Sequence, residues 1–363
     1  MKTLLLGDLS PSETTNPLFK NKEVEKLFND TVSVFQGNDI NFVNLECALT
    51  ECENDIEKFG PPLKAAAEVA DVLAEIGVNC CGLSNNHIFD FGKQGVKDTL
   101  DALSKAGISY TGFGENYEDS RKNIVFEKDG EKVAIIAVCE HEYSYALEDR
   151  MGSRPYDEYD TIEDIANAKK ENDRVIVIYH GGKEHCQYPS PRVRKACRAM
   201  VKNGADVVLC QHSHCIGCYE EYMGSHILYG QGNFHFVVSW EWIDKSLWNN
   251  CLAVKYDTKT NKIEFVPFVV KDSGIALAKG EDKERILAGF EKRNEELKNG
   301  EWKAGWHAFC ESVKERYLTV IKEGYQDDAT ERQNARFAHF LDCEAHTDVW
   351  RELCPTYNMT NEK

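Results

Sequence analysis

The sequence has few basic residues for its size. It contains 43 lysines and arginines against 61 aspartates and glutamates, which gives a formal net charge of −18. Binding to nucleic acid needs a concentrated positive surface that faces the phosphates. We therefore expect no nucleic-acid partner and interpret the acidity as a well-solvated protein surface.

Long apolar segments are also missing. No window approaches the roughly 20 consecutive apolar residues of a membrane-spanning helix. The apolar run that begins at Leu4 is ended by Asp8, whereas a secretory signal needs an apolar region of about 7–15 residues. We therefore expect a cytoplasmic protein with no direct membrane insertion.

The 14 cysteines lack the pattern of a zinc ribbon. Cys215 and Cys218 are separated by two residues, with Cys210 just upstream, but no second pair of this spacing exists. Without an export signal, the thiols are expected to be reduced and mostly buried. A redox or cluster site at these three cysteines stays open as a weaker alternative.

Apolar strand patterns alternate with amphipathic helix patterns as far as about residue 235. Each of three predicted helices is followed by a glycine, which is typical of helix C-termini. This alternation predicts an α/β protein with a largely parallel sheet covered on both faces. The predicted strands are Lys2–Gly7, Ile40–Leu45, Val78–Leu83, Val133–Cys139, Val175–Tyr179 and Val207–Cys210, and the predicted helices are Ala65–Ile76, Lys93–Ala106 and Arg192–Asn203.

The last third of the chain follows a different pattern. A hairpin is expected over Tyr222–Tyr229 with its turn at Gly224-Ser225, and a second between Leu252–Tyr256 and Ile263–Val270. The following charged periodicity predicts helices over Lys283–Leu297, Trp306–Lys322 and Thr330–Leu341. We therefore expect a main domain over residues 1–270 and a helical C-terminal extension over 271–363 that packs on it.

Polar residues follow most of the predicted strands. Ligands of open parallel sheets gather at the carboxyl ends of the strands, so these side chains are expected to converge on one edge. Individually, Asp8 could be a helix cap, Glu46 a solvated turn residue and the Asn85-Asn86 pair ordinary turn chemistry. The strand-end groups are Gly7-Asp8, Asn44-Leu45-Glu46, Ser84-Asn85-Asn86-His87, His180-Gly181-Gly182 and Gln211-His212-Ser213-His214.

The chemistry of the converging set indicates a metal site. Carboxylates, an amide and imidazoles suit one or two divalent ions of Mn, Fe or Zn, and two ions about 3.5–4 Å apart can stabilise an in-line displacement. His87 could instead donate a proton to a leaving group. Asp8 would serve one ion, Glu46 would bridge, Asn86, His180 and His212 would complete the other, and His214 would return to the first.

Several motifs occur together in one order over about residues 1–240. They are Gly7-Asp8, Asn44-Leu45-Glu46, Ser84-Asn85-Asn86-His87-Ile88-Phe89-Asp90-Phe91-Gly92, Gly112-Phe113-Gly114, His180-Gly181-Gly182-Lys183-Glu184, Gly204-Ala205-Asp206-Val207-Val208, His212-Ser213-His214 and Gly230-Gln231-Gly232-Asn233-Phe234. Because it carries these motifs, the chain resembles the bacterial CapA proteins of capsule and poly-γ-glutamate synthesis. Those proteins look like divergent calcineurin-type metallophosphoesterases.

The resemblance implies a four-layer α/β/β/α metallophosphoesterase-like sandwich, to which we add the C-terminal helical appendage. It implies catalytic roles for His87, Asp8 and Glu46, and metal ligands at Asp8, Glu46, Asn86, His180, His212 and His214. Two positions depart from the phosphoesterase pattern. Asp8 is followed by Leu9-Ser10 where an Asp-x-His motif is usual, and Glu46 stands in place of an aspartate. One tight and one weak metal ion is therefore our working hypothesis.

Polar residues beside these motifs are candidates for binding an anionic small-molecule or polymer substrate: Glu140, His141, Lys183, Glu184 and His185. Lys183 could hold a phosphate or carboxylate, or could form a surface ion pair. Trp240, Trp242 and Trp248 could line the mouth of the site or pack the tail helices on the core, and we favour packing.

Two functions are consistent with these observations. The first is a metal-dependent hydrolase of a phosphoester or of an amide, including γ-glutamyl, bond, with His87 as general acid. The second is a non-catalytic, metal-containing accessory protein of capsule or poly-γ-glutamate synthesis. The second would need a membrane-bound partner, since we expect no membrane anchor in this chain. The helical tail could cap the site or form a homodimer.

Overall fold

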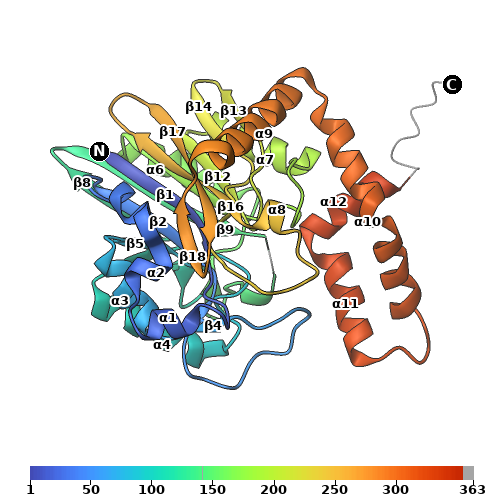
Figure 1. Ribbon diagram of the computed structural model, residues 1–363. Coiled ribbons are helices and arrows are strands. Elements are labelled where there is room, and N and C mark those ends of the chain that lie inside the picture. The colour runs from blue at the N-terminus through green and yellow to red at the C-terminus, as the bar shows by residue number, and fades with distance from the viewer. Residues whose placement is uncertain (141, 355–363) are drawn as a thin grey trace.

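Two mixed β-sheets face each other at the centre of the molecule (Figure 1). The computed structural model describes residues 1–140 and 142–354. The first sheet has the order β18-β17-β16-β1-β2-β5-β6, with β15 also paired to β1, and the second has the order β13-β14-β12-β11-β9-β8. Short strands form two further pairs, β3 with β4 and β7 with β10.

The strands of the first sheet are β1 (Lys2–Leu9), β2 (Ile40–Leu45), β5 (Cys80–Gly82), β6 (Ser109–Thr111), β15 (Asn233–His235), β16 (Asn250–Asp257), β17 (Lys262–Lys271) and β18 (Gly274–Leu277). Those of the second are β8 (Ile124–Lys128), β9 (Glu131–Cys139), β11 (Arg174–His180), β12 (Val207–Gln211), β13 (Tyr219–Tyr222) and β14 (Ser225–Leu228). The short pairs are β3 (Ala48–Leu49), β4 (Lys64–Ala65), β7 (Phe113–Gly114) and β10 (Gly152–Ser153).

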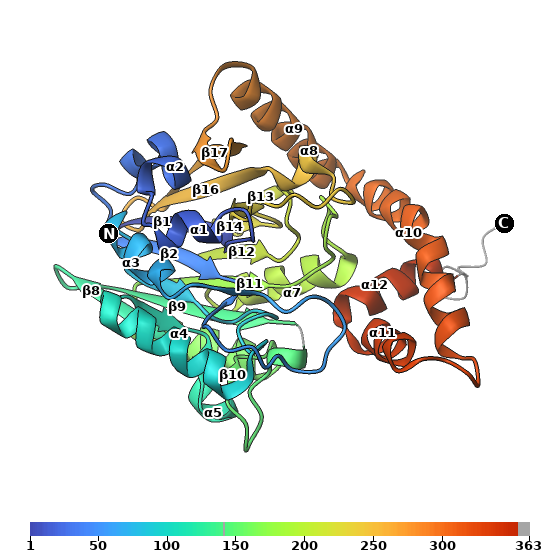
Figure 2. The ribbon, with the colours of Figure 1, turned by 60° about the horizontal axis from the view of Figure 1, so that its bottom comes forward.

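Helices cover the outer face of each sheet (Figure 2). Those near the first sheet are α1 (Asn16–Lys20), α2 (Val24–Phe28), α3 (Glu68–Glu75) and α4 (Gly92–Ala106), and those on the second are α6 (Asp160–Glu171) and α7 (Pro191–Lys202). The other helices are η1 (Asn29–Val34), α5 (Tyr117–Ser120), η2 (Glu142–Ser144), α8 (Lys245–Trp248), α9 (Gly280–Asn299), α10 (Trp302–Gly324), α11 (Glu331–Asp342) and α12 (Glu344–Leu353).

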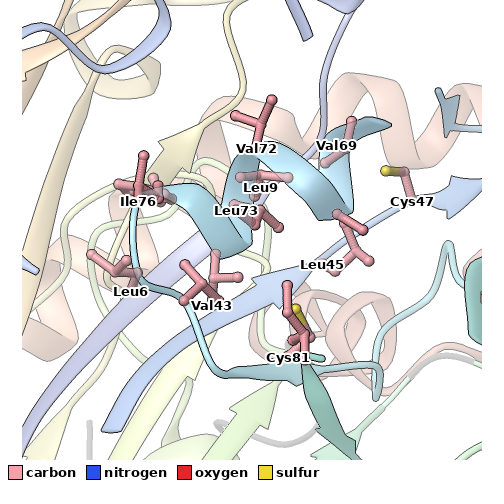
Figure 3. Close-up of a cluster of buried hydrophobic side chains, with 14 of the residues drawn as sticks. Leu6, Leu9, Val43, Leu45, Cys47, Val69, Val72, Leu73, Ile76 and Cys81 are labelled. Atoms are coloured by element: carbon pink, nitrogen blue, oxygen red, sulfur yellow. The ribbon is translucent and has the colours of Figure 1, made fainter. Parts of the chain in front are cut away.

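Three apolar cores hold these layers together. Between the sheets, Leu5 and Phe42 of the first sheet share a buried cluster with Ile178 of the second. Outside the first sheet, Val72 and Leu73 of α3 belong to the cluster shown in Figure 3. A third cluster joins the second sheet to α6, α7 and the C-terminal helices. The four-layer α/β/β/α sandwich is therefore confirmed.

The strand and helix pattern predicts a largely parallel sheet covered on both faces, and the structure has two such sheets, which cover each other. Each sheet carries helices on one face and meets the other sheet on its second face, because its strands are apolar on both sides. Both sheets also contain antiparallel strand pairs, such as β16 with β1 in the first sheet and β8 with β9 at the edge of the second.

Several predicted element boundaries shift in the structure. The helix predicted from Ala65 begins at Glu68, because Lys64–Ala65 pairs with Ala48–Leu49 as a strand. The first hairpin turns at Met223-Gly224, one residue earlier than predicted. In the tail, α9 and α10 are longer than predicted and α12 was not predicted. The chain therefore turns once more at Cys343, between α11 and α12.

The C-terminal helices extend from the sandwich at one end (Figure 1). Trp302, Trp306 and Cys310 of α10 are buried in the same cluster as the outer face of the second sheet. The last strand, β18, ends at Leu277, and the helices begin at Gly280. A division into domains at residue 270 stays a prediction. Within the described part of the chain, no helix combines the length and apolarity needed to cross a membrane.

Candidate metal centre

The ends of four strands from both sheets bring the predicted ligands together. Asp8 lies in β1, and Glu46 directly follows β2, which runs parallel to β1. His180 is the last residue of β11, and the His212-Ser213-His214 turn follows the adjacent parallel strand β12. The site is therefore assembled where the carboxyl ends of strands in two facing sheets meet.

Asp8 is the most extensively bonded of these groups. Its Oδ1 accepts a hydrogen bond from Asn44 Nδ2 at 2.8 Å, and its Oδ2 accepts one from the His212 backbone N–H at 3.0 Å. His180 Nδ1 lies 3.7 Å from Oδ1, and His214 Nδ1 lies 3.6 Å from Oδ2. Burial raises the pKa of Asp8 to about 7, although both hydrogen bonds oppose this shift.

Glu46 carries two buried carboxylate oxygens that have no hydrogen-bond partner among the described residues. Its Oε1 lies 3.3 Å from His180 Nε2 and 3.9 Å from His214 Nε2. Burial and the neighbouring carboxylate of Asp8 raise its pKa well above the usual range. A buried carboxylate without partners is costly unless a cation compensates it.

The donor set fits a divalent metal ion on these observations. One ligand atom each from Glu46, His212 and His214 lies within 4.8 Å of the others. Two more predicted ligands, Asn86 and His180, contact each other, with Asn86 Oδ1 2.9 Å from His180 Nε2. Oxygen and imidazole nitrogen donors of this kind suit Mn, Fe or Zn.

The two histidines after β12 are held in an unusual backbone conformation. The φ angles of His212 and His214 are 78° and 53°, in the left-handed region that non-glycine residues rarely adopt. Asn233 supports the second ring, with its Oδ1 2.8 Å from His214 Nδ1. Burial lowers the pKa of His214 to about 4, so its ring is neutral near pH 7. Strain concentrated in this way is typical of functional sites.

His87 lies beside this centre with a buried ion pair behind it. Its Nδ1 is 2.7 Å from Asp90 Oδ2, and Lys58 contacts the other oxygen of Asp90. The pKa of His87 is lowered by burial and by Lys58, while Asp90 raises it. A hydrogen bond from Nδ1 to Asp90 fixes the ring and leaves Nε2 as the nitrogen available to a reacting group.

The structure places Glu140 inside a buried network. Its carboxylate accepts hydrogen bonds from Tyr179 and from the backbone N–H of Gly182 and pairs with Arg192. A Cβ at Gly181 would lie 2.5 Å from this carboxylate, so the turn needs glycine there. This geometry ties Glu140 to the position of the turn after His180, and its role in substrate binding stays a prediction.

The other predicted substrate residues follow the same turn. Lys183 Nζ lies 3.4 Å from Glu184 Oε2, and the Lys183 side chain is only 8% exposed. The ring of His185 is 6.3 Å from His214 and 5.8 Å from Trp248. His141 lies outside the described residues. Lys183, Glu184 and His185 therefore belong to the border of the centre, beside its histidines.

Trp248 lines the centre, which is the interpretation we did not favour from the sequence. Its ring lies 4.5 Å from that of His214, and its Nε1 donates to the Phe236 carbonyl oxygen. Trp240 and Trp242 stack on each other at 5.4 Å beside it, and Trp242 is exposed. These tryptophans therefore form an apolar rim beside the histidines.

Sequence reasoning missed four residues that shape the site. Asn44 and Asn233 lie within motifs recognised in the sequence, but their hydrogen bonds to Asp8 and His214 depend on contacts between distant strands. Asp90 was likewise part of a recognised motif, three residues after His87. Lys58 lies in the segment between β3 and β4, which carries no pattern that would have marked it.

The cysteines give no support to a redox centre. All fourteen lie in the described part of the chain, where no disulfide joins them. Burial raises the pKa values of Cys215 and Cys218 to about 12, which disfavours the reactive thiolate form.

Known proteins share this sequence pattern. The sequence model of the family described as "Bacterial capsule synthesis protein PGA_cap" matches residues 2–237. The capsule biosynthesis protein CapA of Bacillus anthracis is 32% identical over 222 residues, which cover 59% of this chain and 50% of that protein. The PGA biosynthesis protein CapA of Bacillus subtilis (strain 168) is 30% identical over 242 residues, which cover 65% and 63%. The chain thus spans between half and two thirds of these relatives.

Among solved structures, a 5'-nucleotidase precursor from Thermus thermophilus is similar, with a TM-score of 0.41 and 15% sequence identity. The similarity covers 79% of this chain and 58% of that one. The family match covers most of the chain, including all six predicted metal ligands. This chain therefore belongs to the PGA_cap family of bacterial capsule synthesis proteins.

Proposed function

We propose that this chain is a metal-dependent hydrolase that cleaves a phosphoester or γ-glutamyl amide bond in capsule or poly-γ-glutamate metabolism. The observation that carries the proposal is the pair of buried, unpartnered oxygens of Glu46 beside two histidines. The names of the two Bacillus relatives, which refer to capsule and PGA biosynthesis, support the metabolic setting.

The metal would be held by the residues that surround Glu46. Asp8, Asn86, His180, His212 and His214 would complete the set, and Asn44 and Asn233 would orient Asp8 and His214. When bound, a divalent ion would supply Lewis-acid catalysis. Glu46 and Asp8 would remain ionised in its presence, since a cation reverses the effect of burial on their pKa values.

His87 would transfer a proton at the leaving group. Its Nδ1 is committed to Asp90, so Nε2 would carry the proton that is donated to the departing oxygen or nitrogen. Asp90 would hold the ring in this orientation and stabilise its protonated form, while Lys58 keeps Asp90 ionised. Lys183, largely buried beside the centre, would bind a phosphate or carboxylate of the substrate.

Metal content tests the first half of the proposal. We expect about one to two equivalents of Mn, Fe or Zn in protein purified without chelator, measured by elemental mass spectrometry. His212→Ala should lose the metal held at this centre, at least one equivalent of the total, whereas His307→Ala, at an exposed position on α10, should keep the wild-type content. Absence of metal from the wild-type protein after reconstitution would overturn the proposal.

Turnover of substrate by the metal-loaded protein tests the second half of the proposal, the hydrolase activity. The metal-loaded protein should hydrolyse a member of a phosphodiester and phosphomonoester panel or a γ-glutamyl peptide panel. His87→Ala should retain its metal and lose about 10²–10⁴-fold in turnover, the usual contribution of a general acid. Unchanged turnover in that variant would refute the role of His87, and a loaded wild-type protein that cleaves neither panel would favour the accessory function.

A further inference from the structure

A second group of metal-binding side chains lies in the C-terminal helices. His339 belongs to α11, His346 belongs to α12, and Cys343 is the residue at which the first helix ends and the second begins. One ligand atom from each of these three residues lies within 4.8 Å of the others. None of the six predicted ligands of the metal centre belongs to this group.

The spacing of the three residues explains why they meet. His339 and Cys343 are four residues apart, about one helical turn, and His346 follows three residues later on the next helix. Residues four apart lie on the same face of a helix, so Cys343 follows His339 on one face of α11. The chain turns at Cys343, whose backbone is extended with φ −67° and ψ 126°. The two imidazoles therefore approach each other across the corner, with their ring centroids 5.0 Å apart.

The surroundings hold two of the three groups firmly. Cys343 is 1% exposed and His346 is 7% exposed. Tyr317 Oη lies 2.6 Å from His346 Nδ1, and the His346 ring stacks on Phe340 with centroids 3.9 Å apart. In the tautomer in which Nδ1 donates to the tyrosine oxygen, Nε2 carries the lone pair that would bind the metal. Hydrogen bonding of the second ring nitrogen is typical of histidine ligands.

We propose that His339, Cys343 and His346 bind a zinc ion that fixes the corner between α11 and α12. Two imidazoles and a thiolate are donors that zinc prefers, and three side chains leave one tetrahedral position for a further ligand. In a tetrahedral zinc site the donor atoms are roughly 3.3–3.6 Å apart, so shifts of about 1 Å would close the observed cluster. On binding, the Cys343 thiol would release its proton to solvent as the sulfur–zinc bond forms.

The position of this cluster connects it to the metal centre. The His339 ring stacks on Tyr143 at 5.4 Å and lies 5.7 Å from Phe59. Phe59 belongs to the same segment as Lys58, which contacts Asp90 behind His87. Figure 2 shows this segment, in blue, reaching toward the red C-terminal helices. A zinc ion would therefore fix the position of His339, the residue of the corner that packs against the segment carrying Lys58.

Cobalt binding tests the proposal through the sulfur atom. The residues proposed for the metal centre offer only nitrogen and oxygen donors, so a thiolate-to-Co²⁺ charge-transfer band in the near ultraviolet would report on the C-terminal cluster alone. Co²⁺ is titrated anaerobically into chelator-treated full-length protein. The matched variants are Cys343→Ser and Cys310→Ser, since Cys310 is an equally buried thiol of the same helices outside the cluster.

We expect the band in wild-type protein, in Cys310→Ser and in His212→Ala, and its loss in Cys343→Ser. His339→Gln, at a half-buried position where folding should be retained, should weaken Co²⁺ binding roughly 100-fold. A wild-type protein without the band, or a band that persists in Cys343→Ser, would overturn the zinc site. Because His212→Ala disrupts only the metal centre, this result is independent of the proposed hydrolase activity.

Discussion

Replacing Asp8 with asparagine should stabilise the metal-free protein at alkaline pH while abolishing its stabilisation by metal. Burial raises the pKa of Asp8 from 3.8 to about 7, against the smaller effects of Asn44 and His212. A carboxyl group whose pKa is raised by folding contributes its full stability below pH 3.8 and loses it as the pH rises through about 7. The ionised side chain therefore destabilises the metal-free protein at pH 8.

The magnitude follows from the shift of the pKa. One unit corresponds to about 1.4 kcal/mol, so the ionised carboxylate costs about 4 kcal/mol at pH 8. Asparagine keeps an oxygen for Asn44 but deprives the His212 N–H of its acceptor, which costs about 1 kcal/mol. Asp8→Asn should therefore gain about 3 kcal/mol at pH 8 and less than about 1 kcal/mol at pH 5.

Urea unfolding in the presence of chelator, at pH 5 and pH 8, measures this difference. Asp101→Asn, at an exposed position on α4, is the control and should match wild type at both pH values. With Mn²⁺ at about 100 times its dissociation constant, wild type should gain about 2.7 kcal/mol and Asp8→Asn should gain little. A variant less stable than wild type at both pH values without metal would refute the reasoning.

Three further predictions concern other parts of the molecule. Asp90→Asn should lower turnover roughly 10–100-fold and shift the His87 limb of the pH–rate profile to lower pH, because Asp90 raises the pKa of His87; an unshifted profile would contradict this role. Burial lowers the pKa of His235 from 6.5 to about 4, so this residue alone should remove about 3 kcal/mol of wild-type stability between pH 6.5 and 4. His235→Phe should lose correspondingly less in thermal unfolding, and parallel pH profiles would exclude this explanation. Leu73→Ala, in the fully buried cluster of α3, should cost about 2–5 kcal/mol in urea unfolding, and a loss under about 1 kcal/mol would show that the cavity collapses.

The convergence of polar residues at the candidate metal centre was largely predictable because they occupy recognisable positions along the chain. Asp8, Glu46, His180 and the His212-Ser213-His214 turn each lie at or just after the end of an apolar strand. Strand ends can be identified from local hydrophobicity, and parallel strands place their carboxyl ends at one edge. The convergence of these residues could therefore be predicted without knowing the distances between them.

Contacts between distant segments were not predictable in this way. Lys58 and Asp90 are separated by 32 residues, and no periodic pattern links the segment after β3 to the motif that contains His87. The predicted end of the helix at Leu341 is close to the corner at Cys343, but α12 beyond it was missed, because a helix of 10 residues owes most of its stability to packing against its neighbours. Lys64–Ala65 became a strand only through its partner, β3.

By itself, the sequence determined the apolar strands, six of the α-helices and the set of polar residues that follow the strands, since each depends on short-range patterns of side chains. The two facing sheets followed from the resemblance carried by the motifs and not from the local patterns. Only the tertiary structure decided that Glu46 lies without a hydrogen-bond partner beside His180 and His214, and that α11 and α12 bring two histidines to one cysteine. These features depend on packing between residues far apart in the chain, where the burial of a charge or the approach of two rings is decided by the whole fold.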